Sequence, residues 1–583
     1  MHQVVSLLTP SERRSAIALL ALMVVGILLE TLGIGLVIPA IALLTQHDIG
    51  TSYPALRPIL AALGNPGRNM LVVGGMVALL GVYLVKTIYL TYYTWRQTKF
   101  AFDVQAMLSE RLFTLYLRQP YTFHLQRNSA QLVQNVTGEV DSFAFTAMLP
   151  GLGLLTETLV LGGFGILLFA VEPVGTLIVA CVLGVTAWGF VRATRTRIAR
   201  WGEARQHHAA LRLQHLQQGL SGVKEVKLLG RETEFLEQYR VHNAHSARVN
   251  QRHQTLQQLP RLWLELLAVI GLAILVMTML LRGRAPDLML PTLGLFAAAA
   301  FRLMPSVNRM LAAWHSLRFG LPIINTLYDE LQLSVPEPVP GQPPLKKFAT
   351  ALDLKGVGYA YPGAPSPAIK DISLKIHRGE SVGFIGASGA GKSTLVDILL
   401  GLLKPDRGEV LVDGQDIQQA LRGWQDQIGY VPQTIFLTDD TLASNVAFGL
   451  PDDQIDEKAV WRALCAAQLD DFVRALPQGL DTMVGECGVR LSGGQRQRIG
   501  IARALYHDPA VLVLDEATSS LDTVTEQGVM QAVNALRGSK TLIIVAHRLS
   551  TVKYCDLLYR LERGHISGQG NFEVMTRVPQ VRA

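Results

Sequence analysis

Long apolar runs alternate with polar stretches over the first part of the chain. The hydrocarbon core of a bilayer, about 30 Å thick, needs roughly 20 predominantly apolar residues in a helix that crosses it. Six segments have this length and character: residues 15–44, 70–95, 145–171, 174–191, 262–281 and 288–319. The pattern predicts an all-α membrane domain with six transmembrane helices.

The polar stretches between the second and third runs, and between the fourth and fifth, are long. The latter carries twelve Lys/Arg against five Asp/Glu between Arg192 and Arg252. Because cytoplasmic loops are enriched in Lys and Arg, both stretches and the N-terminus are expected on the cytoplasmic side. Their heptad-like apolar spacing predicts that the spans continue as helices into the cytosol. Bends are expected at residues 121–141 and 219–230.

A proline-rich segment separates this domain from the rest of the chain. Residues 333–344 contain Pro336, Pro338, Pro340, Pro343 and Pro344, and proline cannot continue a helix. We therefore expect a membrane domain at 1–332, an extended linker at 333–347 and an α/β domain at 348–583.

Composition agrees with a protein that lies partly in a membrane. The 583 residues are 49% hydrophobic and only 17% charged, and the mean hydropathy is +0.27. These values exclude a disordered or fibrous chain and disfavour an ordinary soluble enzyme. The net charge of +7 is attributed to cytoplasmic loops rather than to nucleic-acid binding. The four cysteines form no CxxC pair, which excludes a zinc ribbon, and no stretch resembles a cleavable signal.

A phosphate-binding loop follows the short apolar strand expected at 381–385. The loop and the start of the next helix read Gly386-Ala-Ser-Gly-Ala-Gly-Lys-Ser-Thr394, the P-loop pattern in its strand–loop–helix context. Glycines let backbone N–H groups approach phosphates closely, and a helix N-terminus adds partial positive charge. The expected nucleotide-binding residues here are Gly386, Ser388, Gly389, Ala390, Gly391, Lys392, Ser393 and Thr394. Lys392 is expected to reach the β and γ phosphates and Ser393 to bind Mg²⁺.

A second apolar strand, expected at 511–514, ends in Asp515-Glu516. An Asp at such a strand end is a Mg²⁺ ligand in P-loop enzymes. Glu516 is then placed to act as general base on the water that attacks the γ-phosphate.

Leu491-Ser-Gly-Gly-Gln495 precedes a further helical pattern, and with this motif residues 350–583 resemble the nucleotide-binding domains of ATP-binding cassette (ABC) transporters. The resemblance implies that Ser492, Gly493, Gly494 and Gln495 contact ATP held by another subunit. It also implies that Tyr361 stacks on adenine, that Gln433 lies near Mg²⁺ and the attacking water, that Asp522 belongs to the D-loop, and that His547 contacts the γ-phosphate. ATP and Mg²⁺ are the implied cofactors.

One chain supplies one P-loop and one signature motif, so a composite site requires two chains. All motifs are intact, which favours a homodimer with twelve spans. The arrangement resembles that of ABC exporters, half-transporters that work by alternating access in the cytoplasmic (inner) membrane with the nucleotide-binding domains in the cytoplasm. In this resemblance, residues 121–141 and 219–230 are the coupling helices. The implied partners are a second copy, the bilayer and an amphipathic substrate, with no nucleic acid.

Charged residues inside apolar spans are candidates for substrate contact, because an intramembrane charge is costly. They are Glu30, Lys86, Glu157, Arg261, Glu265 and Arg302, of which Arg261 and Glu265 lie at a helix end. Lys86 and Arg302 lie 16 and 14 residues into their spans, about 24 and 21 Å deep at 1.5 Å per residue. Two interpretations stay open: a ring of four cations in the dimer that binds an anionic head group, or internal salt bridges with Glu30 and Glu157.

The first span, with Glu30 followed by Val37-Ile-Pro39, resembles that of the PglK-type flippases of lipid-linked oligosaccharides. This resemblance implies a short external helix, here at 53–64, and a polyprenyl-diphosphate-linked oligosaccharide as substrate. Export of another lipid, a drug or a peptide is the alternative. A soluble cassette ATPase is excluded by the spans.

Overall fold

The protein is described here by a computed structural model that covers residues 2–36, 68–171, 173–281, 286–335, 346–517, 523–546 and 548–577. It divides into two compact units. The first comprises Met1–Gln119 and Phe123–Val335, and the second comprises Pro120–Thr122 and Pro336–Ala583.

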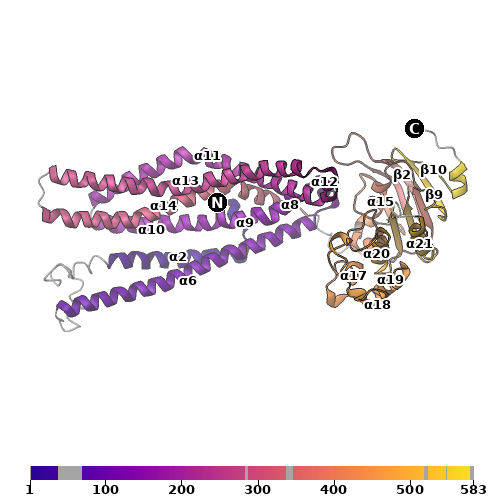
Figure 1. Ribbon diagram of the computed structural model, residues 1–583, viewed down its shortest axis with the longest axis horizontal. Helices are drawn as coiled ribbons and strands as arrows, with labels where there is room; N and C mark the ends of the chain where they lie inside the picture. The colour runs from indigo at the N-terminus through magenta and orange to yellow at the C-terminus, as the bar shows by residue number, and fades with distance from the viewer. Residues whose placement is uncertain are drawn as a thin grey trace. The chain divides into compact units, whose positions relative to one another are not determined.

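The first unit is built of long helices that lie side by side (Figure 1). Helix α2 packs on α6, α10 packs on α2 and α14, and α11, α13 and α14 pack on one another. The helices are α1 (His2–Leu7), α2 (Pro10–Gly35), α6 (Arg68–Leu117), α7 (Tyr121–Gln126), α8 (Ser129–Gln134), α9 (Val140–Ser142), α10 (Leu149–Val171), α11 (Pro173–Ser221), α12 (Val223–Leu229), α13 (Glu232–Leu281) and α14 (Pro286–Leu331).

Local sequence sets where these helices begin and how closely they approach. The Thr9 N–H and hydroxyl both donate to Glu12 Oε2 at 2.8 Å, and Pro10 occupies the first position of α2, where its missing N–H costs nothing. Helix α2 lies against α6 at Gly26, where a Cβ would lie 3.5 Å from Leu90 Cδ2, an ordinary van der Waals contact. Beside it, the Tyr89 hydroxyl donates to the Leu22 carbonyl at 2.7 Å.

Three helices within the described residues are long and apolar enough to cross a membrane: Pro10–Gly33, Val72–Leu117 and Ser129–Ile166. The other expected spans lie in α11, α13 and α14, where part of the side chains is outside the described residues. The prediction that spans extend beyond the bilayer as helices is confirmed, since α6 runs on from Trp95 to Leu117 and α11 runs from Pro173 to Ser221.

Both expected bends contain a short helix. Helix α7 lies in the first, followed by α8 and two π-helical turns, η2 (Asn135–Glu139) and η3 (Phe143–Met148). Helix α12 lies in the second and ends at Gly230, whose φ of 62° and N–H bond to the Lys227 carbonyl form a left-handed cap. The external helix expected at 53–64 lies outside the described residues.

The second unit contains two sheets. A four-stranded sheet has the order β2-β1-β4-β5, and a six-stranded sheet has the order β10-β9-β3-β8-β7-β6. The strands are β1 (Ala351–Tyr359), β2 (Ile369–His377), β3 (Ser381–Ile385), β4 (Arg407–Val412), β5 (Gln415–Asp416), β6 (Ile428–Val431), β7 (Val511–Asp515), β8 (Thr541–Val545), β9 (Leu557–Glu562) and β10 (His565–Gly570). The helices are α15 (Lys392–Leu399), α16 (Leu421–Gln425), α17 (Leu442–Val446), α18 (Glu457–Ala466), α19 (Asp470–Arg474), α20 (Gly493–Leu505), α21 (Thr523–Asn534) and α22 (Phe572–Arg577).

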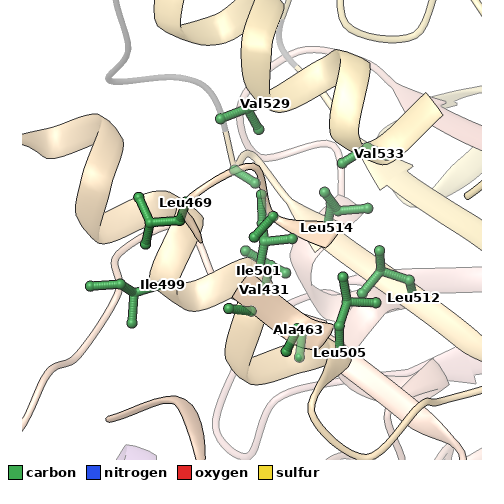
Figure 2. Close-up of a cluster of buried hydrophobic side chains, with 14 of the residues drawn as sticks. Val431, Ala463, Leu469, Ile499, Ile501, Leu505, Leu512, Leu514, Val529 and Val533 are labelled. Carbon is green, nitrogen blue, oxygen red and sulfur yellow. The ribbon is translucent and has the colours of Figure 1, made fainter. Parts of the chain in front are cut away.

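A continuous apolar core joins the six-stranded sheet to the helices beside it (Figure 2). Val431 and Leu514 come from adjacent parallel strands, and Ile501 comes from α20; each is at most 2% exposed. Close packing resists deformation, so the strand ends that carry the polar residues are held in place. The predicted fold class, a helical domain followed by an α/β domain, is confirmed.

Candidate functional site

The polar motifs of the second unit follow parallel strands at one edge of the sheet. Strands β3, β8, β7 and β6 are parallel neighbours, with Val382 paired to Ile543, Leu512 to Leu542 and Val431 to Leu514. Their carboxyl ends therefore meet at the same edge. In open α/β sheets, ligands bind in the crevice outside this edge.

The P-loop has the backbone conformation that a phosphate cradle needs. Gly386, Gly389 and Gly391 have φ values of 155°, 78° and 101°, which L-residues with a Cβ rarely adopt. A Cβ at Gly386 would lie 2.4 Å from the Leu561 carbonyl oxygen, and one at Gly391 would lie 2.8 Å from the Ala368 carbonyl oxygen. Only glycine fits at these two positions. Helix α15 begins directly after Gly391, so its free N–H groups face the loop.

Lys392 lies across the loop and is 5% exposed. Its ammonium donates to the carbonyl oxygens of Gly386 at 2.8 Å and Ala387 at 3.0 Å. Burial lowers the pKa of Lys392, while the carboxylates of Glu516 and Asp515 act in the opposite direction. An ammonium so placed is available to an incoming polyphosphate.

Two acidic residues at the end of β7 and one amide after β6 lie together. Asp515 is the last residue of β7 and is 8% exposed. Glu516 follows with a φ of 48°, a strained conformation of the kind found at functional sites. The Gln433 side-chain N–H donates to Glu516 Oε2 at 2.8 Å, so the structure brings these two predicted site residues into direct contact.

Asp397 on α15 adds a carboxyl group that sequence reasoning did not identify. Burial, with a smaller contribution from the charge of Asp515, raises its pKa to about 6. The larger cause is removal of the carboxyl group from water, and the smaller one shows that Asp397 lies close enough to Asp515 for their charges to repel.

Tyr361 lies beside the start of α15. Its hydroxyl and the Thr394 hydroxyl are 3.1 Å apart, and its ring meets the Tyr359 ring edge-on at 5.1 Å. An aromatic ring is thus present next to the phosphate cradle.

The signature motif begins α20 and is exposed at its start. The Gln495 N–H donates to Ser492 Oγ at 3.2 Å, and the Ser492 N–H donates to Gln495 Oε1 at 2.8 Å. This reciprocal capping fixes Ser492 and Gln495 at the helix N-terminus, where Gly493 adds no side chain. Asp522 and His547 lie outside the described residues.

Comparison with known proteins accounts for both units. Residues 369–519 match the family model described as ABC transporter, and residues 18–284 match that of the ABC transporter transmembrane region. An ATP-dependent lipid A-core flippase of Cupriavidus metallidurans is 32% identical over 79% of this chain and 78% of its own. The chain belongs to the ABC exporter family. A second ATP-dependent lipid A-core flippase, from Thiobacillus denitrificans, is 32% identical over 84% of this exporter and 85% of its own length.

A solved structure of a bacterial Atm1-family ABC exporter with ATP bound has the same fold. It aligns with a TM-score of 0.79 at 23% identity and covers 97% of this exporter and 96% of that chain. The match of its ABC domain and its flippase relatives show that the exporter couples ATP hydrolysis to transport across a membrane.

The structure describes the surroundings of several of the charged residues that the sequence placed in apolar spans. Lys86 on α6 lies against α2, since a Cβ at Gly33 would be 3.5 Å from its Cδ, and its ammonium is 5.0 Å above the Tyr83 ring. Glu30 lies one turn before Gly33 on α2. Arg302 lies in α14, with its side chain outside the described residues.

Glu157 forms an ion pair with a residue that the salt-bridge interpretation did not include. Arg309 on α14 forms a two-pronged ion pair with it, and the second contact, from Arg309 Nη2 to Glu157 Oε2, is 3.2 Å. Among the described side chains, Glu157 therefore has Arg309 as its ion-pair partner. Sequence reasoning did not list Arg309, although it is a cation within the expected 288–319 span. The other listed pair, Arg261 and Glu265, forms an exposed ion pair of 2.8 Å.

Proposed function

We propose that this exporter is a homodimeric flippase that moves a lipid with a large polar head group across the cytoplasmic membrane. The observation that carries the proposal is the joint match of an intact ABC domain and a helical membrane domain to relatives named as lipid A-core flippases. Within this class, a polyprenyl-diphosphate-linked oligosaccharide is the substrate that the first span favours. A glycolipid of the kind named for the relatives is the second candidate.

ATP would bind at the edge of the six-stranded sheet. Lys392 would leave the loop carbonyls for the β and γ phosphates, the N–H groups of residues 386–394 would surround them, and Tyr361 would stack on adenine. His547 would contact the γ-phosphate. Ser393, Asp515 and Gln433 offer hydroxyl, carboxylate and amide oxygens, the hard donors that suit Mg²⁺, which supplies charge neutralisation for phosphoryl transfer.

Glu516 is proposed as the general base for water attack. Its carboxylate is held by the Gln433 amide at 2.8 Å and lies next to Asp515, which places base and metal ligand on successive residues. A base held in this way beside bound ATP would need no large movement before it accepts a proton from the attacking water. Glu516→Gln should keep ATP binding and lose most hydrolysis; near-normal turnover in that variant would show that the base is assigned wrongly.

A second copy would complete each nucleotide site. The chain has one P-loop and one signature motif, and Ser492 with Gln495 already forms a rigid, exposed helix start. We propose that Ser492, Gly493, Gly494, Gln495 and Asp522 of one copy face the ATP held by the other. Cross-linking that yields only monomer while ATPase activity is intact would contradict this.

The substrate head group is proposed to contact Lys86 and Arg302, with Glu30 nearby. Lys86 lies half-buried against Gly33 within apolar helices, where a cation without function is costly. Lys86→Ala with Arg302→Ala should abolish lipid transport in proteoliposomes while hydrolysis of ATP without lipid continues. A matched control is Arg261→Ala, a cation whose side chain is 72% exposed at a helix end. Unchanged transport in the double variant would refute this assignment.

A further inference from the structure

The loop that carries Gln433 is very short and is held at both ends. We define the Gln433 loop as residues 432–435, between the last residue of β6, Val431, and Phe436. At its start, Val431 is fully buried and pairs with Leu514 of β7, one residue before Asp515. The other end is attached to α20, the helix that begins at the signature motif.

Arg503 makes that second attachment. It lies near the C-terminal end of α20, and its guanidinium donates to the Phe436 carbonyl at 2.8 Å and to the Asn445 carbonyl at 2.8 Å. It also donates to Asn445 Oδ1 at 3.3 Å and lies 4.3 Å from the centre of the Phe448 ring. Burial lowers its pKa to about 10, so it stays charged at neutral pH. A planar guanidinium that grips several acceptors holds geometry more tightly than a single hydrogen bond does.

Asn445, the main partner of Arg503, is itself rigid. It is fully buried, its amide donates to the carbonyls of Thr438 and Thr441 at 3.0 Å, and its Oδ1 accepts from the Thr438 N–H at 3.0 Å. Arg503 therefore holds a fixed segment, residues 436–445, and not a mobile one.

The Gln433 loop also packs directly on α20. A Cβ at Gly500 would lie 2.3 Å from Ile435 Cδ1, so the glycine is what lets Ile435 sit on the helix. Ile435 is two residues from Gln433 and one from Phe436. Packing by Ile435 and hydrogen bonding by Arg503 thus act on the same stretch.

We infer that Arg503 is a positioning residue for ATP hydrolysis: it fixes the end of the Gln433 loop on α20, so that the signature helix and Gln433 move as one body. Displacement of α20 at its Ser492 end is then transmitted to the contact between Gln433 and Glu516. The inference rests on the proposed roles of these two residues.

The test is a double-mutant cycle on the full-length exporter in lipid nanodiscs, with kcat and KM for ATP as readouts. Arg503→Gln keeps a polar side chain but loses the planar guanidinium that donates to several acceptors at once. We expect kcat to fall about tenfold and KM to change less than about twofold, since a small displacement of a catalytic group slows chemistry more than binding. In a Gln433→Ala background the same substitution should change kcat less than about twofold, because its target is gone.

The matched control is Arg498→Gln. Arg498 lies on the same helix and also donates to a carbonyl, that of Gln468 at 2.9 Å, but not in the Gln433 loop. We expect its small effect to be equal in both backgrounds. If Arg503→Gln does not fold, Ile435→Ala serves in the same cycle, because it loosens the loop from Gly500 and leaves Arg503 in place.

The outcomes separate this inference from the proposed function. The positioning role alone is overturned if Arg503→Gln, or Ile435→Ala, leaves kcat unchanged. It is also overturned if the substitution lowers kcat equally with and without Gln433. Gln433→Ala that leaves kcat unchanged overturns the proposed role of Gln433 and the inference with it. The inference is supported if Arg503→Gln lowers kcat in the otherwise unchanged exporter but not in the Gln433→Ala background.

Discussion

Glu330, near the C-terminal end of α14, is the centre of a buried polar network outside the expected spans. It is 7% exposed, the Tyr116 hydroxyl donates to its Oε2 at 3.0 Å, and Arg127 forms an ion pair with its Oε1. The Asn135 side-chain N–H donates in turn to the Tyr116 oxygen at 3.1 Å. The network joins α6, the first bend and the end of α14. We predict that Glu330→Gln destabilises the helical unit.

The magnitude follows from the burial of each partner. Breaking a buried ion pair costs about 3–5 kcal/mol when the remaining charge stays buried. The Arg127 side chain is 32% exposed and can turn towards water, so the cost should lie below that range, at about 2–3 kcal/mol. At about 2–4 °C per kcal/mol, the value for domains of 150–250 residues, the unfolding midpoint should fall by roughly 4–12 °C.

The assay is thermal unfolding of the detergent-solubilised exporter followed by tryptophan fluorescence. Glu237→Gln is the matched control, because Glu237 also pairs with an arginine, Arg240, but the two side chains are 60% and 76% exposed. Such a pair contributes at most about 0.5 kcal/mol. A midpoint shift for Glu330→Gln no larger than that of the control would refute the reasoning.

Three further predictions follow from single contacts. Gly386→Ala places a Cβ 2.4 Å from the Leu561 carbonyl oxygen, so binding of a fluorescent ATP analogue should weaken at least tenfold, by about 1.4 kcal/mol; unaltered binding would contradict the cradle geometry. Ser492→Ala removes the cap of α20 and should cost about 0.5–2 kcal/mol in denaturant unfolding; if Ser492 also serves the partner's ATP, ATPase activity should fall more than this loss of stability explains. Burial lowers the pKa of His253 to about 4, so the folded state binds fewer protons than the unfolded state. The free energy of unfolding should therefore fall by about 3 kcal/mol in total as pH drops from about 6.5 to 4. His253→Gln should flatten that part of the pH profile, and an unchanged profile would show that another group causes it.

The strands at the edge that carries Gln433 and Glu516 could be predicted from the sequence because each of them is a local pattern. Short apolar strands such as Val511–Asp515 end directly in their functional residues, so strand and site are read together. The parallel order of β3, β8, β7 and β6 then brings Gln433 to Glu516, a contact between residues 83 positions apart that no local pattern specifies.

The partners of charged residues could not be predicted in the same way. Glu157 had several cations to choose from in the other spans, and only the packing of α10 on α14 selects Arg309. Arg503 shows the same limit, since an arginine in a helical pattern is ordinarily solvated. Its contacts with the carbonyls of Phe436 and Asn445 are set by the fold and cannot be read from the periodicity of the helix.

The most direct test of the proposed function is ATP-dependent lipid flipping in proteoliposomes that contain the purified exporter. Two labelled lipids are compared, a polyprenyl-diphosphate-linked oligosaccharide and a lipid A-core glycolipid, with Glu516→Gln as the blank. We predict ATP-dependent flipping of the polyprenyl-diphosphate-linked oligosaccharide that is lost in the blank. Flipping of the glycolipid alone would transfer the proposal to that class of substrate. Flipping of neither lipid, with ATP hydrolysis intact, would contradict the lipid flippase function.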